Sequence, residues 1–139
     1  MSSEDDLGAD SARFDVRAVP PPEVLRQLAA EPDPIALTFT RCGHSLQKHG
    51  YRPTGSIYPR VAGPPDRYNS AAMRIVDDIF DSPGTVVHQK TRIRHRETVV
   101  FLEVVAVDGR KLGFRWNGLL GAFEFEGFRE PLPRQDDRL

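Results

Sequence analysis

Cysteine is almost absent from this chain of 139 residues, in which Cys42 is the only one. An internal disulfide and a four-cysteine zinc site are therefore excluded. Long apolar runs are absent as well, and none approaches the roughly 18 residues that a membrane-spanning helix needs. The first ten residues, MSSEDDLGAD, are acidic and do not follow the basic-then-apolar order of a secretory signal peptide. These absences predict a cytoplasmic protein without membrane contact.

Acidic residues are missing from two stretches, although the whole chain is nearly neutral, with a net charge of −1. Residues 34–63 contain four Lys or Arg side chains, two histidines and no acid, and so do residues 88–96, HQKTRIRHR. Residues 1–33, in contrast, hold eight acids. Because local charge matters more than the total for a polyanionic partner, the sequence pI of about 6.4 does not argue against nucleic acid.

The length and the distribution of proline and charge predict one folded domain with two flanking segments. Residues 1–20 form an acidic leader, residues 21–132 a single domain, and residues 133–139 a polar tail. Helices are predicted over 22–31, over 41–50 and from 66 to about 82, the last with Asp66 or Asn69 as its N-cap. Residues 35–40, IALTFT, alternate like a strand, and 50–66 read as a loop.

The second half of the chain predicts a β-meander. Four strand-like segments lie at 84–95, 98–107, 111–116 and 121–128. Asp108-Gly109 and Asn117-Gly118 are turn signals between the later strands. The expected fold class is therefore α+β, with short N-terminal helices followed by a four-stranded antiparallel sheet that packs against a helix.

The segment SLQKHGYRPTGS, residues 45–56, gathers Lys48, His49 and Arg52 around a turn without acids. These side chains could simply be solvated. Cationic neighbours also favour the neutral imidazole, which can accept a proton near pH 7. A metal-independent ribonuclease needs such a group, together with cations that stabilise the phosphorane. We therefore interpret His49 as a general base or acid, Lys48 as a phosphorane-stabilising group and Arg52 as a substrate-binding residue.

A second cationic group lies on one face of the first predicted strand, where His88, Lys90, Arg92, Arg94 and Arg96 alternate with Val87, Gln89, Thr91, Ile93 and His95 on the other face. Such a face can prevent edge-to-edge aggregation, but mixed charges would do that as well. Four like charges repel one another, and a bound polyanion would offset the repulsion. We interpret Arg92 and Arg94 as groups that stabilise the phosphorane, Lys90 and Arg94 as substrate-binding residues, and His88 as the second proton-transfer candidate.

The remaining polar and aromatic residues predict no cofactor. The four histidines are not spaced as paired metal ligands and have basic neighbours, so no metal site is expected. Cys42 is interpreted as a packed apolar residue. Tyr51 and Tyr58 lie in the loop and are candidates for stacking on a base, whereas an apolar core is expected to take up the aromatic residues of the last strands, Trp116, Phe123 and Phe125.

Four segments, in order, resemble the C-terminal toxin modules of bacterial polymorphic and contact-dependent inhibition systems. They are LQKHGYRPTGSIYP, YNSAAMRIVDDIFDSPGTVV, DGRKLGFRWNG and GAFEFEGFREP, within about residues 40–132. Those modules carry a Lys-His-Gly segment, a Ser-containing loop, an Asn-bearing helix, an Asp-Gly-Arg hairpin and a Gly-Phe-x-Glu-Pro ending.

The resemblance implies the compact ribonuclease architecture of barnase, EndoU, colicin E5 and RelE. It implies metal-independent cleavage of RNA, often tRNA, and a cognate immunity protein that covers the active site. We expect the product to be a 2′,3′-cyclic phosphate. A toxin module cut from a larger export system would show the same absence of a signal peptide as a cytoplasmic protein. Carried onto this chain, it favours Lys48 and His49, Ser56 in the loop, and His88 or a basic residue on the first strand. The alternative is a non-catalytic adaptor that keeps the fold and binds nucleic acid or a protein through the same basic surface.

Overall fold

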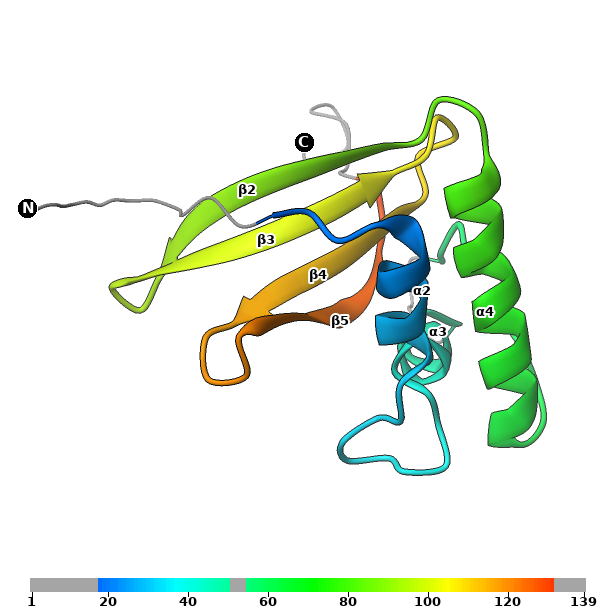
Figure 1. Ribbon diagram of the computed structural model, residues 1–139. Helices are drawn as coiled ribbons and strands as arrows, with labels where there is room; N and C mark the ends of the chain where they lie inside the picture. The colour runs from blue at the N-terminus through cyan, green and yellow to red at the C-terminus, as the bar shows by residue number, and fades with distance from the viewer. Residues whose placement is uncertain (1–17, 51–54, 132–139) are drawn as a thin grey trace, which may run out of the picture.

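The computed structural model describes residues 18–50 and 55–131, in which three helices precede a four-stranded antiparallel sheet (Figure 1). The predicted α+β fold is therefore confirmed. Most of the predicted leader, residues 1–17, and the predicted tail lie outside the described residues. The helices gather on one side of the sheet (Figure 1). The turn between the first two strands and the turn between the last two strands extend beyond the helices (Figure 1).

The first two helices lie where the sequence predicts them. Helix α2 spans Pro22–Ala30 and begins with a proline, whose missing N–H needs no partner at this position. Helix α3 spans Arg41–Gly50. Thr40 caps α3, because its Oγ1 accepts a hydrogen bond from the Gly43 N–H at 3.0 Å.

Helix α4 spans Pro65–Asp81 and starts differently from the prediction. Pro64 is its N-cap and no side chain caps it, so the expectation that Asp66 or Asn69 does so is wrong. Asn69 is used between helices instead, where its Oδ1 accepts the Thr40 N–H at 2.8 Å. Gly43 allows this close approach of α3 to α4, since a Cβ there would lie 2.1 Å from Asn69 Oδ1.

The strand predicted at 35–40 is wrong. Within this segment only Thr40 pairs, in an isolated bridge with Pro32. The Asp33 carboxylate accepts hydrogen bonds from the backbone N–H groups of Ile35 and Ala36, at 3.2 and 2.9 Å. A side chain that binds its neighbours' N–H groups in this way replaces the strand ladder with a turn.

The sheet follows the predicted meander, with strands β2 (Val86–Arg94), β3 (Glu97–Val105), β4 (Lys111–Asn117) and β5 (Ala122–Arg129) in sequence order. A two-residue turn joins β2 to β3, and both of its residues, His95 and Arg96, have positive φ. The predicted Asp108-Gly109 turn is confirmed, with φ of 100° at Gly109, and the β4–β5 turn also lies where predicted.

One face of the sheet packs against the helices and forms the core. The sheet contributes buried side chains such as Leu102, Leu112 and Phe114, and the helices contribute Leu25 and Val76. The expected core positions of Phe123 and Phe125 are confirmed. The Trp116 side chain is partly buried and packs against the core. Burial of Cys42 is confirmed as well. The opposite face of the sheet does not pack against this core, so its side chains can line a binding site.

Candidate functional site

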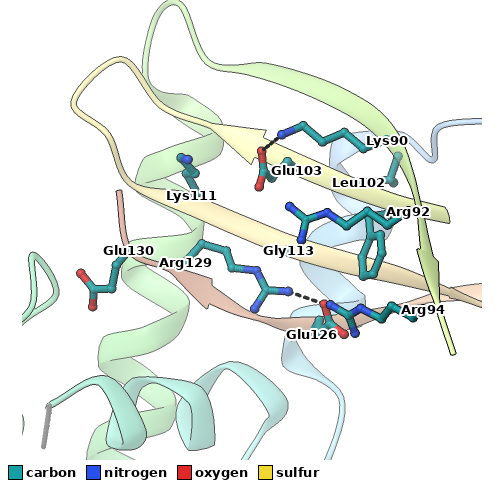
Figure 2. A pocket seen from close by; sticks show the side chains of 11 residues that line it. Lys90, Arg92, Arg94, Leu102, Glu103, Lys111, Gly113, Glu126, Arg129 and Glu130 are labelled. Carbon is teal, nitrogen blue, oxygen red and sulfur yellow. Dashed lines mark hydrogen bonds and ion pairs between the residues drawn. The ribbon is translucent and has the colours of Figure 1, made fainter. Parts of the chain in front are cut away.

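A hollow of about 530 Å³ lies on the open face of the sheet (Figure 2). Figure 2 shows that side chains from β2 and from β5 point toward one another across the two central strands. Its lining residues are Lys90, Arg92, Arg94, Phe101, Leu102, Glu103, Lys111, Gly113, Glu126, Arg129 and Glu130.

The strand register brings these residues to one face. Lys90 pairs with Phe101, Glu103 with Gly113, and Lys111 with Arg129. Residues that are directly opposite in an antiparallel ladder point to the same side of the sheet. The predicted cationic face of β2 is thus confirmed, and cations of β4 and β5 extend it.

The hollow keeps an excess of positive charge after its ion pairs are formed. Lys90 Nζ lies 2.9 Å from Glu103 Oε1, and Arg129 is paired with Glu126. Burial opposes ionisation of Glu103, but the hydrogen bond and the charge of Lys90 prevail and lower the pKa of this carboxyl group. Three cations remain without an ion-pair partner among the described residues: Arg92, Arg94 and Lys111.

Phe101 holds two of these cations in place without neutralising them. The Arg94 guanidinium carbon lies 4.8 Å from the centroid of the Phe101 ring, and that of Arg92 lies 6.0 Å from it. An aromatic face attracts a guanidinium through its quadrupole and leaves the N–H donors available. Phosphate is recognised by such donors, so the arrangement suits a phosphodiester.

Gly113 makes room for Arg129 on the floor of the hollow. A Cβ at Gly113 would lie 2.8 Å from Arg129 Nε and 2.9 Å from its Nη2. The Arg129 side chain therefore crosses β4 where β4 has no side chain of its own (Figure 2).

Replacing Gly113 with alanine is expected to displace the Arg129 guanidinium and to weaken the binding of a phosphodiester, while the fold is retained because only the end of a flexible side chain must move. Binding of a phosphodiester polyanion, measured beside far-UV circular dichroism, tests this. Gly118→Ala is the matched control, because its new Cβ meets only Trp116 at 4.0 Å. Equal affinities of the two variants would show that the place of Arg129 over β4 does not matter for binding.

His49 is buried, which the sequence does not predict. Its ring Nδ1 lies 2.6 Å from Glu130 Oε2, and its Nε2 lies 2.8 Å from the Phe128 carbonyl oxygen. Both partners are oxygen atoms of the protein, so each ring nitrogen already has a neighbour within hydrogen-bonding distance. The expectation that His49 has only cationic neighbours is therefore wrong, and its role in proton transfer stays a prediction.

Glu130 ties the loop after α3 to the end of β5. It accepts hydrogen bonds from the Ser56 hydroxyl and from the Ile57 N–H, the latter at 3.3 Å. Burial opposes its ionisation, but the hydrogen bonds from Ser56 and His49 prevail, so the pKa of Glu130 is lowered. The acidic residue in the Gly-Phe-x-Glu-Pro ending is the signal that could have indicated this contact.

Tyr58 is 3% exposed and leaves no ring face on which a base could stack. Its hydroxyl lies 2.7 Å from the Arg129 carbonyl oxygen and accepts the Lys111 N–H at 2.9 Å. Burial raises the pKa of Tyr58 to about 12. The ring thus joins α3 and the loop to strands β4 and β5. The other predicted residues of this loop, Tyr51 and Arg52, lie outside the described residues.

The predicted site residues fall into two groups in the structure. Lys90, Arg92 and Arg94 line the hollow, and His88 is exposed on the same strand face beyond its lining. Lys48 is exposed on α3 and lines a second, smaller cavity with His49. Sequence reasoning missed the β4 and β5 residues of the hollow, although the alternation in KLGFRW and FEFEGFR could have indicated them.

Within residues 18–50 and 55–131, no group of three or more His, Cys, Asp or Glu side chains is arranged to hold a metal ion. No helix in that part of the chain has the length and apolar character needed to cross a membrane.

Comparison with known proteins gives one family. The family model described as the CdiA C-terminal tRNase toxin domain matches residues 30–130, a range that includes every residue lining the hollow. No curated protein and no solved structure matches the chain.

Proposed function

Because the chain belongs to the CdiA C-terminal tRNase toxin domain family, we propose that its basic hollow binds the tRNA backbone and that one phosphodiester is cleaved there without a metal ion. Membership of the family makes the chain an RNA-cleaving toxin domain of contact-dependent inhibition, with tRNA as the substrate class. The binding site, the metal independence and the chemistry are the proposal.

The observation that carries the proposal is the surplus of cations in the hollow. Arg92 and Arg94 approach from β2 and Lys111 from β4, and none of them has an ion-pair partner among the described residues. Guanidinium groups bind phosphate oxygens through paired N–H donors. A phosphorane carries one more negative charge than the phosphodiester, so fixed cations stabilise the transition state more than the ground state.

The proposed reaction is attack of a ribose 2′-oxygen on the adjacent phosphorus, with departure of the 5′-oxygen and formation of a 2′,3′-cyclic phosphate. It requires one group that removes the 2′-hydroxyl proton and a source of a proton for the 5′-oxygen. His88 remains a candidate, since it shares the β2 face with the cations at the rim of the hollow. His49 is proposed to act through Glu130, as a positioning residue that fixes the end of β5.

An immunity protein is the proposed protein partner. A protein that blocks this hollow would have to neutralise the same cations as RNA does, so we expect its contact surface to present carboxylates to Arg92, Arg94 and Lys111.

Incubation of the full chain with total tRNA tests the proposed function. We expect cleavage in EDTA and in magnesium alike, with 2′,3′-cyclic phosphate on the new ends and no cleavage by heat-denatured protein. Cleavage that requires magnesium would contradict the metal-independent step. If the folded protein binds tRNA but leaves it intact in both buffers, the non-catalytic adaptor is the correct description.

A further inference from the structure

A histidine that the sequence did not single out lies in the second cavity, beside the hollow. His44 Nδ1 is 3.1 Å from Asp33 Oδ1, and the Phe39 ring lies 5.4 Å from the imidazole, measured between centroids. The other ring nitrogen, Nε2, has no hydrogen-bond partner among the described residues. The side chain is 23% exposed. His44 is thus fixed at one nitrogen and open at the other.

Asp33 is itself held in place by the turn that replaces the predicted strand. Its Oδ2 accepts the N–H groups of Ile35 and Ala36, and its other oxygen faces His44. Burial opposes ionisation, but these N–H donors and His44 prevail and lower the pKa of Asp33. An ionised carboxylate on one imidazole nitrogen orients the ring and stabilises the imidazolium that forms when the other nitrogen takes a proton.

The cavity around His44 has a volume of about 330 Å³ and is lined by charged groups from α3 and β5. From α3 come Arg41 and Lys48, which lie three and four residues from His44 and so share its helix face. Arg41 lies near Glu124 and Glu31, at 3.6 and 3.9 Å, whereas Lys48 has no ion pair among the described residues. The other ionisable groups that line the cavity are Asp33, His49, Glu126 and Arg129.

The cavity and the hollow adjoin along β5. Glu126 and Arg129 line both of them. Between these two residues Gly127 has no side chain, and a Cβ there would lie 3.0 Å from Ser45 Oγ, so α3 lies close against the strand. One RNA strand could therefore hold a phosphate among the cations of the hollow and place a neighbouring ribose over β5, toward α3.

From this geometry we infer that His44, oriented by Asp33, is the base that removes the 2′-hydroxyl proton of this ribose, and that Lys48 adds positive charge to the phosphorane from the side of the second cavity. This inference rests on the proposed function and assigns its proton-transfer step. His49 is less suited, because both of its ring nitrogens already have acceptors within hydrogen-bonding distance.

Protons and bonds are conserved in this step. The 2′-oxygen forms a bond to phosphorus as its proton passes to His44 Nε2. The bond from phosphorus to the 5′-oxygen breaks, and this oxygen takes a proton from solvent water. The imidazolium then returns its proton to the hydroxide left behind, so His44 ends neutral and the products are a 2′,3′-cyclic phosphate and a 5′-hydroxyl.

The full chain carrying His44→Gln tests the inference, with single-turnover cleavage of tRNA in EDTA as the first measurement. We expect the rate to fall by roughly 10²–10⁴-fold, the usual contribution of a proton-transfer group. Binding of a tRNA blocked by 2′-O-methylation should not change, because the cations of the hollow are intact. His95→Gln, in the exposed β2–β3 turn, is the matched control and should cleave at the wild-type rate.

Asp33→Asn separates catalysis from folding, since the amide oxygen can still accept the N–H groups of Ile35 and Ala36. Without the carboxylate the imidazolium is less stable, so we expect the rising limb of the pH–rate profile to move to lower pH. Wild-type cleavage by His44→Gln, or an unmoved limb in Asp33→Asn, would overturn the inference and leave the proposed function standing. If the wild-type protein itself does not cleave in EDTA, the proposed function fails first.

Discussion

Replacement of His49 with alanine is expected to lower the free energy of unfolding by about 3 kcal/mol, because it removes the hydrogen-bond partner of two acceptors at the end of β5 together with a buried ring. Those acceptors are the Phe128 carbonyl oxygen and the Glu130 carboxylate. The lost ring also packs against Tyr58 and Phe128, with centroids at 5.3 and 6.4 Å.

Urea unfolding monitored by fluorescence measures this loss, and His88→Ala is the matched control because His88 is exposed. Since the pKa of Glu130 is lowered in the folded state, its contribution to stability is present above the unfolded pKa of about 4.3 and is lost as the pH falls through the folded value. Glu130→Gln should therefore make unfolding less sensitive to acid. If His49→Ala is as stable as His88→Ala, the contact of α3 with the end of β5 does not support the fold.

Simultaneous replacement of Arg92 and Arg94 with alanine is expected to weaken tRNA binding on the order of 100-fold, since each charged hydrogen bond contributes about 1.5 kcal/mol or more. Both guanidinium groups lie over Phe101, within the hollow, and neither has an ion-pair partner among the described residues. The plot of log affinity against log salt concentration should become less steep by about 2 units, because two fewer phosphates are neutralised. Titrations of blocked tRNA at several salt concentrations measure both quantities.

The control for this double variant is Arg67→Ala with Arg74→Ala, which removes the same charge from exposed positions of α4, outside the hollow. A general loss of attraction between protein and RNA would affect both double variants equally. Equal salt slopes for the two double variants would contradict the assignment of the hollow as the phosphate site. Cleavage that is lost in the variant of Arg92 and Arg94 but kept in the variant of Arg67 and Arg74 would support it.

The sheet could be predicted from the sequence because its strands alternate and its turns carry local signals. Asp108-Gly109 marks one turn, and the even-numbered residues of β2 share a face as the period of two requires. The segment 35–40 has the same alternation but no strand, since Asp33 binds the N–H groups that a ladder would need. A local pattern cannot show that a side chain will compete for the backbone in this way.

The site on α3 was harder to predict, because residues that are adjacent in sequence separate on a helix. Lys48 and His49 follow one another, yet successive helix positions point about 100° apart, so Lys48 faces solvent while His49 is buried. His44, one turn earlier, is the histidine on the same face as Lys48. The spacing of four residues was visible in the sequence, but only the burial of His49 distinguishes the two histidines.

The contact of His49 with Glu130 has a further consequence for the order of folding. These residues are 81 positions apart, and Ser45 and Phe128, which also join α3 to β5, are 83 apart. The four strands, in contrast, pair only with neighbours in sequence. Closure of a long loop costs more entropy than formation of a hairpin. We therefore expect the meander to form early during refolding and α3 to dock late, so that RNA binding recovers before cleavage.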